Sequence, residues 1–177
     1  MADTVHRVPT LTFSFIPNFL GSRCIVIAEY KQNNKDFMMI IREMTIDDYE
    51  EVYQMWLTTS RRALSEADEK PQLERYLKRN AGMSQVAVID GKIVGTVLAG
   101  HDGRRGFIHH MAVMPEYRRQ RIGHSLAEKA IEKIKAEGID KTHIFSYQNN
   151  STGQSFWSDF GFEKRDDVFV FSYDNNK

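Results

Sequence analysis

Residues 109–126 read HHMAVMPEYRRQRIGHSL, and this stretch decides the fold. An apolar strand over 107–113 runs into Pro115, which ends it. Apolar residues then recur at helical spacing from Ile122 until Gly138 stops the pattern. The sequence therefore predicts a strand, a short loop and a long amphipathic helix, in that order.

The loop between this strand and this helix is basic. It carries Arg118, Arg119 and Arg121, and the helix opens with Gly123. The first N–H groups of a helix have no partner within it, and the helix dipole adds positive potential, so such an end binds anions. A glycine there lets a phosphate approach the backbone. From the arginines alone, the alternative is a solvated basic loop that merely caps the helix.

The rest of the chain alternates between strand and helix patterns, which predicts an α/β domain with a mixed, mostly antiparallel central sheet flanked by helices. Thr45 and Pro71 are expected to begin two helices, and Asp90-Gly91 to form a hairpin turn. The predicted strands cover 39–42, 85–89, 92–100, 107–113 and 142–147, a short helix covers 151–160, and a final hairpin pairs 162–165 with 168–173.

The first 37 residues differ from the rest because they lack sustained periodicity. One strand is expected within 22–30, followed by a polar linker over 31–36. We expect residues 1–37 to be an N-terminal extension or an over-called start site, and residues 38–177 to form the compact domain.

Composition excludes several classes of protein. Lys plus Arg and Asp plus Glu both number 24, so the zero net charge argues against a general nucleic-acid binder. The single cysteine, Cys24, excludes an internal disulfide framework and a cysteine-rich zinc site. No apolar run is long enough to span a bilayer, and Pro17 interrupts the nearest candidate for a signal peptide. We expect a cytoplasmic protein without a metal, a membrane partner or a nucleic-acid partner.

Two motifs resemble the GNAT N-acetyltransferase family. The family's pyrophosphate-binding pattern, Gln/Arg-x-x-Gly-x-Gly/Ala, matches residues 118–123, with Arg121 in place of the first glycine. The family's second pattern, Asn-x-x-Ala-x-x-Leu/Phe-Tyr followed by Gly-Phe, is similar to residues 150–162. Here Gly153 replaces the alanine and Trp157 replaces the tyrosine. The resemblance covers residues 39–173.

This resemblance implies the GNAT fold, acetyl-CoA as cosubstrate, and transfer of the acetyl group to a primary amine by direct attack. It assigns the acetyl-CoA site to a strand, to the loop and helix start that follow it, and to one asparagine: Met111, Ala112, Val113, Arg118, Arg119, Arg121, Ile122, Gly123, His124 and Asn150. The acceptor is an amine-bearing small molecule, or a protein N-terminus or lysine. A homodimer through an exposed strand edge is compatible with the sequence.

His109 is the candidate for the base or proton relay that deprotonates the amine. An imidazole pKa near 6.5 suits that role, and His109 is expected on the same strand face as Met111, with His110 on the opposite face. Trp157 cannot donate the proton that the family's tyrosine gives to the departing thiolate, and Tyr147 is a possible substitute.

The acceptor groove is expected between residues 46–80 and the central strands. Its border carries mixed charge that selects no acceptor class: Arg61, Arg62, Glu66, Asp68 and Glu69. Two other functions stay open at this point. One is a non-catalytic acetyl-CoA-binding module or sensor, favoured by Trp157 and Arg121; the weaker one is an enzyme that binds another phosphate ligand at the basic helix start.

Overall fold

The computed structural model describes residues 12–16, 25–32 and 35–175. Contacts divide the chain into two units, residues 1–144 and residues 145–177, and each unit is described by itself. Cys24 lies outside the described residues, as does the start of the strand predicted within 22–30.

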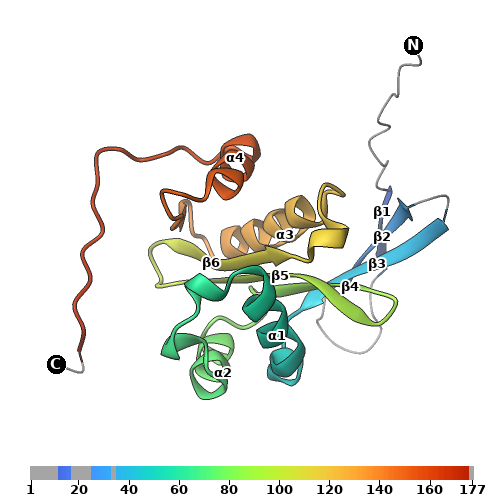
Figure 1. The fold of residues 1–177 in the computed structure, drawn as a ribbon, viewed down its shortest axis with the longest axis horizontal. Helices are drawn as coiled ribbons and strands as arrows, with labels where there is room; N and C mark the ends of the chain where they lie inside the picture. Colours follow the sequence, from blue (N-terminus) through green and yellow to red (C-terminus); the bar gives the residue numbers. More distant parts are fainter. Residues whose placement is uncertain (1–11, 17–24, 33–34, 176–177) are drawn as a thin grey trace, which may run out of the picture. The chain divides into compact units, whose positions relative to one another are not determined.

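The first unit is built on one sheet, whose strands are neighbours in chain order within the described residues (Figure 1). The strands are β1 (Thr12–Ile16), β2 (Ile25–Gln32), β3 (Lys35–Glu43), β4 (Gln85–Ile89), β5 (Lys92–His101), β6 (Gly106–Val113) and β7 (Thr142–Ile144). Each neighbouring pair is antiparallel except β6 and β7, which are parallel. The predicted mixed, mostly antiparallel sheet is confirmed. The proposed domain start at residue 38 stays a prediction.

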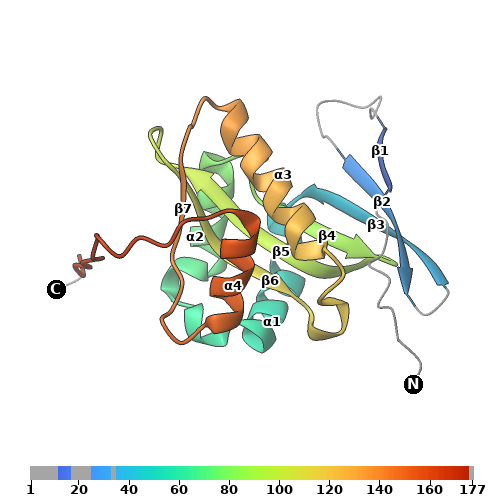
Figure 2. The same cartoon turned by 90° about the horizontal axis from the view of Figure 1, so that it is seen from above.

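Helices cover both faces of this sheet (Figures 1 and 2). Helices α1 (Tyr49–Thr59) and α2 (Lys70–Arg79) lie on one face, and α3 (Ile122–Ala136) lies on the other. Short 3-10 turns over Arg61–Ala63 and Glu66–Asp68 connect α1 to α2. Another turn, Pro115–Tyr117, follows β6 where the proline was expected to break the strand.

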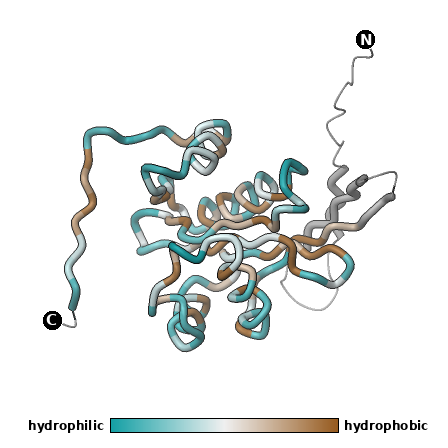
Figure 3. The backbone as a smooth tube through the Cα atoms, viewed as in Figure 1, coloured by the Kyte–Doolittle hydropathy of each residue, from teal (hydrophilic) through white to brown (hydrophobic). Residues whose placement is uncertain are grey.

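Two apolar layers hold the helices on the sheet, and Figure 3 shows apolar residues concentrated along the central strands. The layer under α1 and α2 buries Met44, Val52, Met55, Trp56, Leu73, Val86, Ile93, Leu98 and Ala112. On α3, Ile131 is half-buried and the other residues predicted at helical spacing are buried: Ile122, Leu126, Ala127, Ala130 and Ile134. At about 25 cal/mol per Å² of apolar surface, each buried Val, Leu, Ile or Met among them contributes roughly 1.5–3 kcal/mol.

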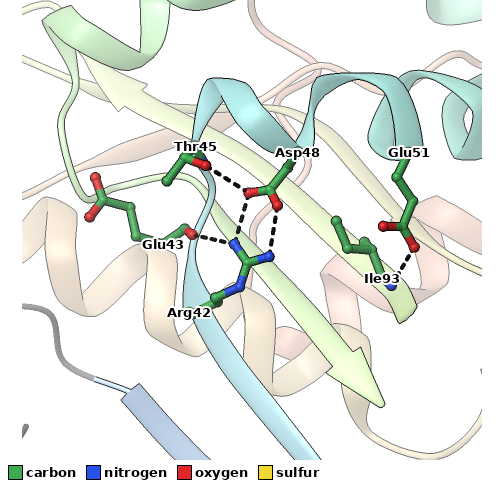
Figure 4. A network of polar contacts seen from close by, with 6 residues as sticks. All are labelled: Arg42, Glu43, Thr45, Asp48, Glu51 and Ile93. Carbon is green, nitrogen blue, oxygen red and sulfur yellow. Dashed lines mark hydrogen bonds and ion pairs between the residues drawn. The ribbon is translucent and has the colours of Figure 1, made fainter. Parts of the chain in front are cut away.

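A polar network fixes the start of α1 against the end of β3 (Figure 4). Thr45 and Asp48 form a capping box, with the Thr45 N–H donating to Asp48 Oδ2 over 2.8 Å. Arg42 donates two hydrogen bonds to the same carboxylate, over 2.7 and 2.8 Å. One turn later, Glu51 accepts a 2.7 Å hydrogen bond from the N–H of Ile93 in β5. The predicted N-terminal signal at Thr45 is confirmed for a 3-10 turn, Ile46–Asp48, which leads directly into α1.

The second unit contains α4 (Ser151–Phe160), which ends at Gly161 in a left-handed conformation with a φ of 108°. The final hairpin predicted over 162–165 and 168–173 is wrong, because neither segment is a strand in the structure. Lys164 pairs with Asp166 and Arg165 with Asp167, so the charges between the two segments form local ion pairs. A two-stranded hairpin without a further strand or packed face is at most marginally stable.

Candidate active site

The centre of β6 carries a β-bulge. On the β5 side, Ala99 pairs with Ile108 and Val97 pairs with Met111. One residue of β5, Leu98, therefore lies opposite two residues of β6, and the extra residue falls within His109-His110. A bulge bends its strand and re-aims the side chains that follow it.

The bulge reverses the face predicted for His109. A Cβ on Gly95 would lie 2.9 Å from Leu126 of α3, so this side of β5 faces α3, and so do Val97 and its partner Met111. The His109 ring instead lies 5.6 Å from the ring of Tyr76 in α2. The prediction that His109 shares a face with Met111 is wrong because it assumed an unbroken period of two.

The His109 side chain is open to solvent and lies among aromatic rings. The residue is exposed, yet its ring stacks on Phe107 with 6.1 Å between centroids. Although part of the residue is open to water, partial desolvation of the imidazole lowers the pKa of His109 below 6.5, and the neighbouring His110 lowers it further, against a smaller opposing effect of Asp68. His109 is therefore predominantly neutral at pH 7, with a free lone pair for a proton. Sequence reasoning missed Tyr76, whose buried hydroxyl has no hydrogen-bond partner among the described residues.

His110 is buried under α1, so it lies on the same side of the sheet as His109, and the predicted opposite face is wrong because of the bulge. Its Nε2 lies 2.9 Å from Oδ1 of Asp68, and its ring stacks on Trp56 with 4.7 Å between centroids. Burial alone would raise the pKa of Asp68, but the hydrogen bonds from His110 and Ser65 outweigh burial and lower it from 3.8. Asp68 was expected among the charges that border the acceptor groove, and the structure buries it instead.

Beyond the bulge, β6 diverges from β7. The two strands pair only from Gly106 opposite Thr142 to Ile108 opposite Ile144, where β7 ends, and β6 continues to Val113. Residues 111–113 still pair with β5 on their other side. The main-chain groups of this part of β6 that point away from β5 are therefore not used by β7.

The loop that follows β6 leads into the helix start where the anion site was predicted. Arg119 and Arg121 have left-handed backbones, with φ values of 62° and 60°. The first helical hydrogen bond runs from the Ser125 N–H to the Arg121 carbonyl over 2.9 Å, so the N–H groups of residues 122–124 point out of the end of α3. Among the residues that the structure describes, no side chain caps this end. Arg121, where the family has glycine, adopts a left-handed conformation that glycine favours, so the backbone keeps the shape that the family's glycine would allow.

The other residues predicted to bind acetyl-CoA at this loop differ in their contacts and in their burial. Arg118 donates from Nε to the Val113 carbonyl over 3.0 Å, which ties the loop to the end of β6. Ile122 is buried in the core, so only its main chain is available. His124 lies in the first turn of α3, with its Nδ1 3.3 Å from Oε2 of Glu128.

In the second unit, Asn150 is the N-cap of α4 and accepts a 3.0 Å hydrogen bond from the Gly153 N–H. A Cβ at Gly153 would meet the side-chain amide of Asn150. Trp157 packs edge-on against Phe156 and Phe162, with centroids 4.9 and 5.0 Å apart. Its indole is a packing group rather than an acid.

A family model described as "Acetyltransferase (GNAT) family" matches residues 47–162. The chain belongs to the GNAT acetyltransferase family. It is 30% identical over 134 residues to acetyltransferase SG1711 of Sodalis glossinidius (strain morsitans), a match that covers 75% of this chain and 92% of that protein. As a GNAT member it is an acyltransferase, and acetyl-CoA is its cosubstrate. The family thus favours an enzyme over a non-catalytic acetyl-CoA-binding module.

Solved structures share the fold at lower identity. The aminoglycoside N-acetyltransferase AAC(6')-Iy in complex with CoA has a TM-score of 0.67 and 18% identity, covering 80% of this chain and 99% of its own. The ribosomal-protein-alanine N-acetyltransferase of Brucella melitensis biovar Abortus 2308 has a TM-score of 0.61 and 18% identity, with coverage of 76% and 99%. These likenesses support the GNAT fold.

The described residues hold neither a candidate metal cluster nor a helix that could span a membrane. No three His, Cys, Asp or Glu side chains among them are grouped closely enough to hold a metal ion. Within the same part of the chain, every helix is too short or too polar to cross a bilayer.

Proposed function

We propose that this GNAT enzyme transfers the acetyl group of acetyl-CoA directly to a primary amine at the open edge of β6. The divergence of β6 from β7, immediately before the anion-binding start of α3, carries the proposal. This divergence leaves an extended main chain, not paired by β7, next to the proposed phosphate site. Acetyl-CoA is a long molecule with a pyrophosphate towards one end, and it needs these two features side by side.

In this proposal the donor is held along its length. The main chain of Met111, Ala112 and Val113 pairs with the amide-bearing arm, as one more strand would. The N–H groups of Ile122, Gly123 and His124, with the charges of Arg118, Arg119 and Arg121, bind the pyrophosphate. The resemblance adds Asn150, of the second unit, as a ligand of the arm or the phosphate.

The reaction then needs a neutral amine and a place for its proton. The amine nitrogen forms a bond to the acetyl carbon, the carbon–sulfur bond breaks, and CoA leaves as a thiolate. His109 accepts the amine proton, a role for which its lowered pKa prepares it. Main-chain N–H groups of β6 stabilise the developing oxyanion. A thiol pKa near 8.5 lets the thiolate leave with little acid help, so Trp157 does not stop turnover.

The acceptor enters from the side of α1 and α2, because the His109 ring contacts Tyr76 on that side. Its class is an amine-bearing small molecule, or a protein N-terminus or lysine. The names of the two structural neighbours support both classes, since one is an aminoglycoside and the other a ribosomal-protein-alanine acetyltransferase. We place the reaction in the cytoplasm. A homodimer is compatible with this proposal.

Calorimetric titration of acetyl-CoA, followed by a free-thiol release assay with pooled amines, tests the proposed function. We expect binding, and thiol release with at least one pool of small amines or peptides. Absence of binding would refute the donor site. Binding without release, across small amines, peptide N-termini and lysine peptides, would refute transfer to an amine.

A further inference from the structure

The buried contact between Asp68 and His110 links two parts of the chain that are far apart in sequence. Both side chains are nearly inaccessible, at 7% and 8% exposure, and 2.9 Å separates Oδ1 of Asp68 from Nε2 of His110. The His110 ring stacks on Trp56, and the Trp56 indole donates a 2.9 Å hydrogen bond to Thr96 of β5. His110 is thus fixed both by stacking and by one polar partner.

The second oxygen of Asp68 holds a different segment. Oδ2 accepts a 2.8 Å hydrogen bond from the Ser65 N–H and lies 3.2 Å from the Ser65 hydroxyl, which completes a capping box. This box closes the turn between α1 and α2, on the side from which the acceptor is proposed to enter. One carboxylate therefore fastens the acceptor-side connection to the bulge of β6.

The bulge is also where His109 lies. His109 and His110 are adjacent in the irregular part of the strand. A shift of the backbone at His110 therefore displaces the backbone at His109, and the His109 ring moves with it. The charges of His110 and of Asp68, from the α1–α2 connection, affect the pKa of His109, and its ring contacts Tyr76 from α2. The pair thus acts on His109 through both backbone position and charge.

We propose that Asp68 and His110 are positioning residues for acetyl transfer, which hold the β6 bulge so that the His109 imidazole faces the acceptor amine. This inference rests on the proposed function. Neither residue touches substrate. Their effect is to keep a neutral imidazole in place, and misplacement of a reacting group by about 1 Å can cost about 100-fold in rate.

The structure supplies a matched control. Asp48 is also a largely buried carboxylate in a capping box, with Thr45, but its second partner is Arg42 rather than a histidine. Asp48→Asn and Asp68→Asn therefore make the same chemical change in the same local geometry. Only the second change removes a contact to the bulge.

We expect Asp68→Asn to lower kcat by about 10- to 100-fold while the KM for acetyl-CoA stays unchanged. Asp48→Asn should lose stability and retain kcat. His110→Phe, which keeps the stack on Trp56 but loses the polar contact, should lower kcat similarly. The double variant Asp68→Asn/His110→Phe should lose no more than the worse single variant, because the two residues act as one unit. A kcat for Asp68→Asn within about twofold of wild type, or equal losses in both Asn variants, would overturn the proposal.

An NMR titration of the His109 imidazole gives a readout that does not depend on turnover. Asp68→Asn should shift the pKa of His109, and Asp48→Asn should leave it unchanged. If the wild-type protein transfers acetyl to no amine, the proposed function fails, but this titration still tests the link. Unchanged chemical shifts and an unchanged pKa of the His109 ring in Asp68→Asn would show that the ring has not moved and would refute the positioning role by itself.

Discussion

The left-handed conformation of Arg121 yields a prediction in which stability and affinity change in opposite directions. With φ at 60° and ψ at 4°, Arg121 lies where an L-residue pays roughly 1–2 kcal/mol and glycine pays nothing. The larger entropy of an unfolded glycine offsets roughly 0.5–1 kcal/mol of that gain. Arg121→Gly should therefore raise the free energy of unfolding by about 0.5–1 kcal/mol, which is about 1–4 °C in Tm for a chain of this size.

The same substitution removes one guanidinium from the proposed pyrophosphate site. Arg121 is exposed, and an exposed ion pair contributes up to about 1 kcal/mol, so the Kd for acetyl-CoA should rise up to about fivefold. S-acetylpantetheine lacks the pyrophosphate, and its binding should not change.

Urea unfolding and calorimetric titration measure the two effects separately. Arg121→Ala is the matched control, because it removes the charge and keeps the Cβ that makes the conformation unfavourable. It should weaken acetyl-CoA binding as much as Arg121→Gly does, without the gain in stability. An Arg121→Gly variant less stable than wild type would refute the conformational argument, and an unchanged Kd would remove Arg121 from the phosphate site.

Three further predictions concern the frame of the site. The pKa of Asp48 in the folded protein is lowered from 3.8, so the ionised carboxylate stabilises the fold above that pH. This stabilisation is lost as the pH falls through the folded-state pKa. In urea unfolding, the advantage of the wild type over Asp48→Asn should therefore shrink only below about pH 3.8. Gly153→Ala, which would normally stabilise a helix, should lower Tm because its Cβ meets the amide of Asn150, and a higher Tm would contradict that contact. Trp56→Phe should cost about 1 kcal/mol in thermal or urea unfolding because the hydrogen bond to Thr96 is lost, and no cost would show that this bond is not stabilising.

Much of the fold could be predicted from the sequence because its signals are local. The capping residue Thr45, the turn Asp90-Gly91 and the apolar spacing from Ile122 each depend on neighbours a few positions away, and the structure agrees with them. The phosphate-loop motif is also local, and its helix start was expected. The hairpin at the end of the chain was not predictable in this way, since a strand pattern forms a strand only where a partner is available.

The parts of the site that depend on contacts across the fold were missed. A bulge interrupts the period of two without any glycine or proline to announce it, so the side of the sheet occupied by His109 was predicted wrongly. Asp68 reads as one charge among several in a polar connection, and its burial follows only once α1 and α2 pack on the sheet. The pattern Ser65-x-x-Asp68, a capping-box signature, was the available signal that this carboxylate is held in place.

The pH dependence of turnover in His109→Ala tests the central claim most directly. If His109 takes the proton of the acceptor amine, the variant should be slower by about 100-fold or more near pH 7, as expected for loss of a general base. Its rate should recover as the pH rises, because the amine then loses its proton to water. A rate and a pH profile identical to those of the wild type would remove His109 from the reaction and contradict the account.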